Sequence, residues 1–311
     1  MTPSHAAPAS LPTASSDVSV VVPHYGDPAG VTALVARLRD EPGVAEVVVV
    51  DDCSPEPLGR LEGAQVVRRA TNGGFGAAVN TGVAATRGDL LLVLNSDVDF
   101  EPGFVRRLAT AAAPWQPALA GPAVRTGGAV EHTARRFPAA RYQAVERVRV
   151  LGRFQGADWW ARSIGQDLRA RPGSDRPVDW VAGVCLLLPR SAFDLVGGFD
   201  ERYFMYAEEV DLQRRLADVG IRRVYLGSVV LDHVGGASSD PARARTWLAQ
   251  SRTTYAAKWG GLGRLRALLT GVALVNAATA AVRRAAGRPV HPARELAADL
   301  RDAWERPQRA R

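Results

Sequence analysis

Three carboxylates stand close together in segment 197–214, which leads from a loop rich in glycine and aromatic residues into an expected helix. Glu208, Glu209 and Asp211 would occupy the first turn of that helix, which we expect to stop at Gly220 because glycine often ends a helix. A helix N-terminus favours anions, so these groups would be ionised near pH 7 and could accept a proton from a substrate. The alternative is that these acids, with Asp211 one turn before a basic residue, simply support the helix.

Two more acids, Asp51 and Asp52, end a run of four valines, and a carboxylate at the carboxyl end of a strand can meet a base or a ribose hydroxyl. Ordinary turn chemistry at the Ser-Pro pair that follows is the alternative. Segment 71–82 then forms a glycine-rich entry into a helix, where exposed backbone amides can approach a phosphate or a sugar. It does not match a dinucleotide-binding fingerprint, because Val79 replaces the third glycine and the acids precede the loop.

Asp97 and Asp99 follow the apolar run 90–95, and His233 follows a second apolar run that begins at Val229. Mg²⁺ or Mn²⁺ bound through one or two carboxylates, with Asp97 as the main candidate, would keep open positions for substrate phosphates. The alternatives are that both aspartates end the strand and cap the next helix, and that the histidine is structural. Imidazole is also a common ligand for metals of the manganese type.

These residues need a scaffold, and from residue 18 onward short β-branched runs alternate with amphipathic segments. We expect strands at 18–22, 46–51, 65–68 and 90–95, and helices at 28–40, 76–85 and 102–113. Near-continuous apolar strands separated by helices indicate an α/β fold whose mostly parallel sheet is covered on both faces, with ligands at the carboxyl ends of the strands. A polar region rich in Arg and Trp, about 127–176, and a further strand at 178–188 would form the second half of the same domain.

The chain of 311 residues, 47% of them hydrophobic, divides by composition into three parts. Residues 1–16 are rich in Ala, Pro and Ser and lack the charged and apolar regions of a signal peptide, so we expect a disordered tail. Residues 17–240 would form the α/β domain, and residues 241–311 a helical extension. Cys53 and Cys185 lie far apart and neither belongs to a metal-type pair, which fits a reducing compartment and excludes a disulfide scaffold.

The extension contains an arginine-flanked apolar segment, 264–285, whose core of about 16 residues is shorter than the ~20 that span a bilayer. An interfacial helix on anionic lipid is one interpretation, and a helix packed on the domain is the other. The formal charge of +7 permits a membrane surface, a phosphorylated substrate or nucleic acid as partner. Nucleic acid is not expected, because the sequence shows neither a recognition motif nor basic residues interleaved with aromatic ones.

Six motifs follow one another along the chain. They are Val-Pro-His-Tyr (22–25), Asp-Asp-Cys-Ser (51–54), Asn-Gly-Gly-Phe-Gly (72–76), Asn-Ser-Asp-Val (95–98), Asp-Trp-Val-Ala-Gly (179–183) and, within 197–212, Gly-Gly-Phe-Asp-Glu with Phe-Met-Tyr-Ala-Glu-Glu-Val-Asp-Leu. In this order they resemble the family 2 glycosyltransferases of the GT-A fold, and most of all the bacterial rhamnosyltransferase-type members. The resemblance runs from Ser19 to Ser238 and depends on the whole set, since each motif alone is weak.

The resemblance implies a nucleotide-sugar donor bound along the carboxyl ends of the first strands. Pro23 and Tyr25 would lie by the nucleotide, and Asp52 would recognise the base. The loop 72–76 would face the ribose and the diphosphate. The donor-binding residues that the resemblance implies are Pro23, Tyr25, Asp52, Asn72, Gly74, Phe75, Asn95, Ser96 and Asp97.

The metal site is implied by the same resemblance. Asn95, Ser96 and Asp97 take the place of the family's Asp-x-Asp motif, so that Asp97 would hold a Mg²⁺ or Mn²⁺ ion that bridges the diphosphate. Because Asn95 stands at the first position, one carboxylate of that motif is missing. His233 would complete the metal site from the far side.

For catalysis the resemblance implies that Glu209, the second acid of the pair, is the base. The family usually has Asp at this position, so Glu208 stays a second candidate. Trp180, Gly183 and Tyr206 would form the acceptor wall, since flat rings pack well on sugar faces. Core packing is the alternative for the other aromatic and apolar residues of the run 203–206.

Together these features predict a metal-dependent inverting glycosyltransferase. The resemblance favours dTDP-rhamnose as donor and a cell-envelope or lipid-linked glycan as acceptor. It also favours a cytoplasmic enzyme that is peripheral on the inner face of the cell membrane. The rival interpretation is a non-catalytic basic protein of the same fold that binds a glycan or nucleic acid.

Overall fold

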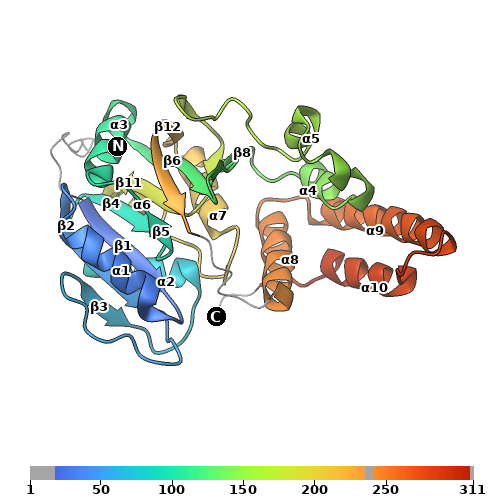
Figure 1. Ribbon diagram of the computed structural model, residues 1–311, viewed down its shortest axis with the longest axis horizontal. Helices are drawn as coiled ribbons and strands as arrows, with labels where there is room; N and C mark the ends of the chain where they lie inside the picture. Colours follow the sequence, from blue (N-terminus) through green and yellow to red (C-terminus); the bar gives the residue numbers. More distant parts are fainter. Residues whose placement is uncertain (1–17, 235–240, 309–311) are drawn as a thin grey trace, which may run out of the picture.

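A mixed β-sheet forms the centre of the computed structural model, which describes residues 18–234 and 241–308. Its strand order is β3-β2-β1-β4-β11-β6-β12-β5 (Figure 1). The expected tail and the glycine-rich segment after residue 234 lie outside the described residues. The strands along this path are β1 (Val18–His24), β2 (Val44–Asp51), β3 (Gln65–Arg68), β4 (Leu90–Leu94), β5 (Val98–Asp99), β6 (Ala118–Thr126), β11 (Cys185–Pro189) and β12 (Arg222–His233).

Strand direction changes at β11. Strands β3, β2, β1 and β4 pair in parallel, whereas β11 runs antiparallel to both β4 and β6. Strand β6 is parallel to β12, and the short β5 is antiparallel to it. The parallel half places the ends of β1, β2 and β4 at one edge, where the predicted donor residues follow them.

Helices cover both faces of the sheet, as the apolar runs predicted. They are α1 (Pro28–Arg39), α2 (Phe75–Ala85), α3 (Phe104–Ala112), α6 (Arg190–Leu195) and α7 (Glu208–Asp218). Successive strand residues point to opposite faces: Val20 and Val22 pack with α1 and α3, while Val21 packs with α2, α6 and α7. Helix α7 ends before Gly220, whose φ of +80° supports the predicted stop.

The expected single strand at 178–188 is wrong, because the chain forms two separate strands there. Strand β10 (Trp180–Val181) pairs with β8 (Ala134–Arg135) in a small second sheet, and β11 begins only at Cys185. Gln213 of α7 explains the break. Its side chain accepts from the Val181 N–H at 2.8 Å and donates to the Val181 carbonyl at 2.7 Å, which ties β10 to the helix. Two short strands, β7 (Ala129–Val130) and β9 (Asp175–Pro177), pair at the sides of the main sheet.

The C-terminal helices form a lobe to one side of the sheet, with α9 and α10 farthest from it (Figure 1). Helices α8 (Pro241–Lys258), α9 (Leu262–Ala285) and α10 (Pro292–Ala303) pack on one another, and α9 also packs on α4 (Ala140–Glu146). Part of the polar region 127–176 therefore joins this lobe, including the short helices η2 (Arg149–Phe154) and α5 (Asp158–Ser163). A 3-10 helix, η1 (Ala113–Trp115), follows α3.

Helix α9 has one packed face and one exposed face. Leu265, Leu269 and Ala273 are buried, whereas Leu274 and Val282 are more than half exposed. The helix is longer than the expected segment, and by length and composition it could cross a membrane. The packed face lies on α4 and α10, which fits a helix packed within the protein. The exposed face is apolar, which fits an interfacial helix.

Candidate active site

Helix α7 starts from a strained turn. Tyr206 and Ala207 adopt positive φ angles of 70° and 64°, a left-handed conformation that costs about 1–2 kcal/mol per non-glycine residue. The Ser251 hydroxyl of α8 donates to the Met205 carbonyl at 2.7 Å and holds the turn from the helical lobe. The turn places the two glutamates that follow at the boundary between the sheet and that lobe, and the Tyr206 side chain is exposed there.

The two glutamates at the start of α7 lack partners for part of their carboxylates. Glu208 is only 4% exposed, and Oε2 of both Glu208 and Glu209 is buried without a hydrogen bond from any described residue. Burial raises the pKa of Glu208 well above its usual range, with the charge of Glu209 as a second cause. Burial also raises the pKa of Glu209.

The expectation that the helix end keeps this pair ionised is therefore wrong in direction. Desolvation can move a pKa by several units, whereas a helix end contributes about 0.3–1 kcal/mol. A raised pKa makes a carboxylate a stronger proton acceptor toward a sugar hydroxyl.

Asp211 behaves as the structural alternative predicted. It is fully buried, forms ion pairs with Arg215 at 2.9 Å and Lys258 at 2.8 Å, and accepts from Trp259 Nε1 at 2.9 Å. Lys258 and Trp259 come from the end of α8, so Asp211 joins the lobe to α7. These two partners could not be predicted from the sequence, because they are distant in the chain and carry no motif.

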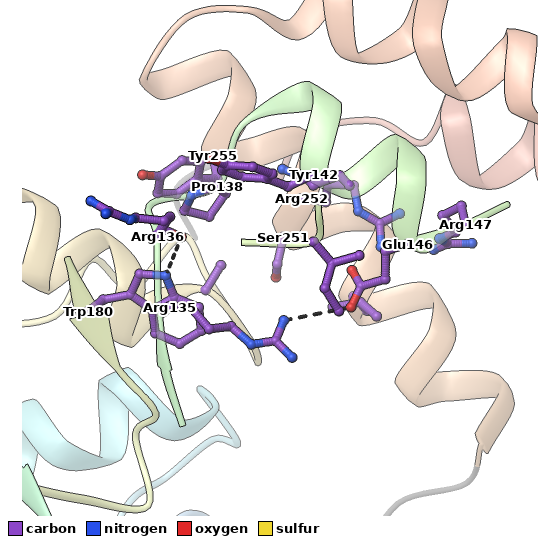
Figure 2. Close-up of a pocket in the computed structure, with 14 residues that line it drawn as sticks. Arg135, Arg136, Pro138, Tyr142, Glu146, Arg147, Trp180, Ser251, Arg252 and Tyr255 are labelled. Carbon is purple, nitrogen blue, oxygen red and sulfur yellow. Dashed lines mark hydrogen bonds and ion pairs between the residues drawn. The ribbon is translucent and has the colours of Figure 1, made fainter. Parts of the chain in front are cut away.

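Gly183 of the predicted acceptor wall packs against Glu209. A Cβ atom at Gly183 would be 3.3 Å from Cβ and Cγ of Glu209, which is a crowded distance, so glycine allows the Glu209 side chain to lie this close. Trp180 donates from Nε1 to the Arg136 carbonyl at 2.9 Å (Figure 2). This hydrogen bond fixes the indole at the mouth of a cavity described below.

On the donor side, Asp52 anchors the glycine-rich loop. Its carboxylate accepts from the N–H groups of Gly73 at 3.0 Å and Gly74 at 2.7 Å and forms an ion pair with Arg69 at 2.8 Å. The Phe75 N–H donates to the carbonyl of residue 204 at 3.2 Å. These three loop amides are therefore used within the protein, and the role of loop 72–76 toward the ribose and the diphosphate stays a prediction.

Gly74 joins the donor loop to the turn before α7. Its φ is +86°, and a Cβ atom there would lie 1.8 Å from the Phe204 carbonyl oxygen, which no side chain can accommodate. The Asn72 side chain accepts from the Gly74 N–H at 3.2 Å. The glycine-rich loop 72–76 and the turn before α7 thus hold each other in place.

Pro23 and Tyr25 lie at the carboxyl end of β1, as predicted, and Tyr25 is 50% exposed. Its ring is free to stack on a flat ligand. The neighbouring Asp51 is different. Although burial alone would raise its pKa, hydrogen bonds from the N–H groups of Leu58 and Ser54 and from Arg68 lower that pKa to about 2. Asp51 is therefore part of the scaffold.

Asp97 and His233 meet, as the metal prediction requires. Strand β5 pairs with β12 so that His233 lies opposite Val98, and Nε2 of His233 is 3.2 Å from Oδ2 of Asp97. Asn95 and Ser96 form the turn that leads to Asp97, with the Asn95 N–H bonded to the carbonyl of residue 184. Among residues 18–234 and 241–308, no cluster of three or more metal-type ligands occurs.

Two ligands are still enough for the predicted ion. Mg²⁺ and Mn²⁺ in phosphate-transfer sites often use one or two protein groups and complete their shell with substrate oxygens and water. The two side chains are partly exposed, which leaves an approach for a diphosphate.

Known proteins place this arrangement in a family. The family model described as Glycosyl transferase family 2 matches residues 19–166. Over 209 residues the chain is 37% identical to N-acetylglucosaminyl-diphospho-decaprenol L-rhamnosyltransferase of Mycobacterium tuberculosis, which covers 63% of this chain and 67% of that relative. The chain belongs to glycosyl transferase family 2. It is a glycosyltransferase, and the rival interpretation as a non-catalytic binding protein finds no support.

A second relative of this glycosyltransferase is the pre-mycofactocin glycosyltransferase of the same organism, 30% identical over 257 residues, or 80% of this chain and 48% of that one. Two solved structures confirm the GT-A fold. GalNAc-T7 with UDP, GalNAc and Mn²⁺ has a TM-score of 0.57 at 12% identity, covering 94% of this chain and 55% of that chain. The mannosyltransferase PcManGT from Pyrobaculum calidifontis with GDP-Man and Mn²⁺ has a TM-score of 0.55 at 19% identity, covering 91% and 79%.

Proposed function

We propose that this glycosyltransferase transfers a sugar from a nucleoside diphosphate to an acceptor hydroxyl in one inverting displacement, with Glu209 as the base. The observation that carries the proposal is the carboxylate of Glu209, whose buried Oε2 lacks a hydrogen bond from any described residue and whose side chain packs against Gly183 of the predicted acceptor wall. Glu209 takes the proton as the acceptor oxygen attacks the anomeric carbon, and the nucleoside diphosphate leaves on the opposite face. Glu208 is more deeply buried, and the charge of Glu209 helps to raise its pKa, so Glu208 is the less accessible acid of the pair.

Asp97 and His233 would hold a Mg²⁺ or Mn²⁺ ion, supported by their 3.2 Å separation. When bound, such an ion neutralises the charge of the departing diphosphate. The chain's own residues orient the donor: Tyr25 offers its exposed ring to the base, and Asp52 keeps the glycine-rich loop in position.

The name of one relative supports a choice of donor sugar. One of them is named an L-rhamnosyltransferase that acts on a diphospho-decaprenol-linked sugar, which supports dTDP-rhamnose as donor and a lipid-linked glycan as acceptor. The exposed apolar face of α9 supports a place on the inner face of the cell membrane.

A donor panel tests the proposal. The purified chain is incubated with nucleotide sugars, Mn²⁺ or Mg²⁺ and a lipid-linked acceptor, and the anomeric configuration of the product is read by NMR. We expect dTDP-rhamnose to be used, metal to be required and the configuration to be inverted. Retention of configuration, or full activity in a metal chelator, would contradict the mechanism.

A further inference from the structure

A cavity of about 400 Å³ lies between α4, α8 and the small β8–β10 sheet (Figure 2). Its wall combines aromatic rings with positive charge: among the lining residues are four arginines and a single carboxylate, that of Glu146. The residues that carry the argument are Arg135, Arg136, Arg147, Arg252, Trp180 and Tyr255.

Three of the four arginines have carboxylate partners. Arg135 lies 3.6 Å from Glu146, and Arg136 lies 3.7 Å from Asp179. Arg147 pairs with Asp302 at 2.9 Å, and that carboxylate also receives the Arg245 guanidinium at 2.8 Å.

Arg252 differs from the other three. It is 9% exposed, its Nη1 is buried without a hydrogen bond, and within the described part of the chain it forms no ion pair. Burial, with the charge of Arg147 as the next cause, lowers its pKa to about 10. The group is still charged at neutral pH. The charges of Glu146 and Asp302 favour its charged form, but neither carboxylate forms an ion pair with it, and a buried charge that lacks part of its hydrogen bonds is costly. An anionic ligand would remove that cost.

The cavity lies beside the turn before α7. Ala207, which directly precedes Glu208, and Trp180 both line it. Ser251, the next residue to Arg252 on α8, binds the turn itself through the Met205 carbonyl. The cavity therefore lies next to the turn from which the two glutamates follow.

We propose that this cavity binds the phosphate or diphosphate group of the acceptor, with Arg252 as the principal ligand and the other arginines around it. The inference rests on the proposed function, because it makes the anion part of the molecule whose hydroxyl Glu209 deprotonates. Charged hydrogen bonds from a forked guanidinium suit phosphate oxygens. The Trp180 and Tyr255 rings offer flat surfaces for the attached sugar.

Two acceptors that carry the same sugar test the assignment, one an alkyl diphosphate ester and the other a neutral octyl glycoside. With Arg252→Gln, KM for the diphosphate acceptor should rise roughly 10- to 100-fold while kcat changes little, as expected for lost hydrogen bonds to a charged group. KM for the neutral acceptor should stay unchanged, and Arg252→Lys should give an intermediate effect. Arg149→Gln is the matched control, since Arg149 pairs with Glu295 and Asp299 outside the cavity.

A titration with inorganic pyrophosphate in a metal chelator gives a readout that does not need activity. The wild-type chain should bind pyrophosphate, and Arg252→Gln should weaken that binding about tenfold or more. The inference would be overturned if Arg252→Gln raised KM equally for both acceptors, or if it left pyrophosphate binding unchanged. It would also fail if Arg252→Gln reduced only the binding of phosphatidylglycerol vesicles, because the anion would then be bulk lipid. If no acceptor is glycosylated with any donor, the proposed function fails, and the titration still decides the anion site.

Discussion

The donor side and the acceptor side of this molecule treat buried charge in opposite ways. On the donor side, Asp51 and Asp52 are buried, and both carboxylates have several hydrogen-bond and ion-pair partners, including Arg68 and Arg69. On the acceptor side, Glu208 and Arg252 are buried and Glu209 is half-buried, and each has a buried polar atom without a hydrogen bond from residues 18–234 and 241–308.

Buried charged groups with partners in the protein stabilise the fold, whereas those with unsatisfied atoms are available to bind a substrate. A fully satisfied buried charge holds backbone in place, whereas an unsatisfied one costs stability and persists where function requires it. Asp211 makes the contrast sharp, because it lies in the same helical turn as the glutamates and yet has three side-chain partners within 2.9 Å.

Removal of the satisfied charge should have the largest effect on stability. Asp211→Ala leaves Trp259 and Arg215 without their acceptor, and we expect the free energy of unfolding to fall by about 3 kcal/mol. Urea unfolding followed by circular dichroism measures it. Asp158→Ala is the control, since its pair with Arg162 is exposed and is worth under about 0.5 kcal/mol. Equal losses in the two variants would remove the distinction between scaffold and site.

Removal of the unsatisfied charge should slow turnover without lowering stability. We expect Glu209→Gln to lower kcat by about 100-fold or more, because general-base assistance is worth that much. Donor affinity should remain near wild type, and the unfolding midpoint should not fall. If Glu208→Gln alone abolishes transfer while Glu209→Gln does not, the base is assigned to the wrong member of the pair.

The raised pKa of Glu209 predicts how the rate and the stability of the wild-type chain depend on pH. A base that must be deprotonated gives a rate that rises with pH through its folded pKa, above the ~4.3 of an ordinary glutamate. For stability the sign is opposite: between the ordinary and the raised pKa the unfolded chain binds fewer protons, so stability falls as pH rises. Glu209→Gln should remove the corresponding limb from the kcat/KM profile.

Much of the donor half could be predicted from the sequence because its signals are local. Runs of β-branched residues specified β1, β2 and β3 almost to the residue, and a single glycine, Gly220, marked the end of α7. The meeting of Asp97 with His233 was implied by the resemblance to the family, because the two residues lie on β5 and β12, which are far apart in the chain.

The acceptor half could not be predicted in the same way, because its partners come from distant elements. Gln213 splits the expected strand at 178–188 by binding Val181, and Lys258 reaches Asp211 from the end of α8. The direction of the glutamate pKa shifts depends on burial, which the sequence around Glu208 and Glu209 does not encode.

The metal pair gives a smaller expected effect, because each ligand is only one of several around the ion. Asp97→Asn should raise the dissociation constants for Mn²⁺ and for the nucleotide sugar together, each by about tenfold or more. Calorimetric titrations of donor with and without Mn²⁺ measure both. Donor binding that keeps its metal dependence in this variant would exclude Asp97 from the site.

The smallest expected effect concerns the exposed face of α9, which carries the proposed contact with the membrane. Truncation after Trp259 is a poor test, because Gln308 binds the Phe204 N–H at 3.1 Å and thus supports the turn before α7. Substitution on the exposed face avoids that problem: Leu274→Gln with Val282→Gln changes two side chains that are 56% and 71% exposed.

These exposed side chains contribute little to folding, so the free energy of unfolding should change by no more than about 0.5 kcal/mol. Each would bury apolar area in a lipid surface, and the loss of both should weaken pelleting with anionic vesicles by roughly tenfold at ~25 cal/mol per Å². Transfer to a soluble acceptor should be unchanged while transfer to a lipid-linked acceptor in vesicles falls. If pelleting is instead governed by Arg283 and Arg284 alone, the contact is electrostatic and disappears at high salt, since surface charges are screened within about 10 Å at 0.1 M. The apolar face would then have no part in placing the acceptor at Glu209.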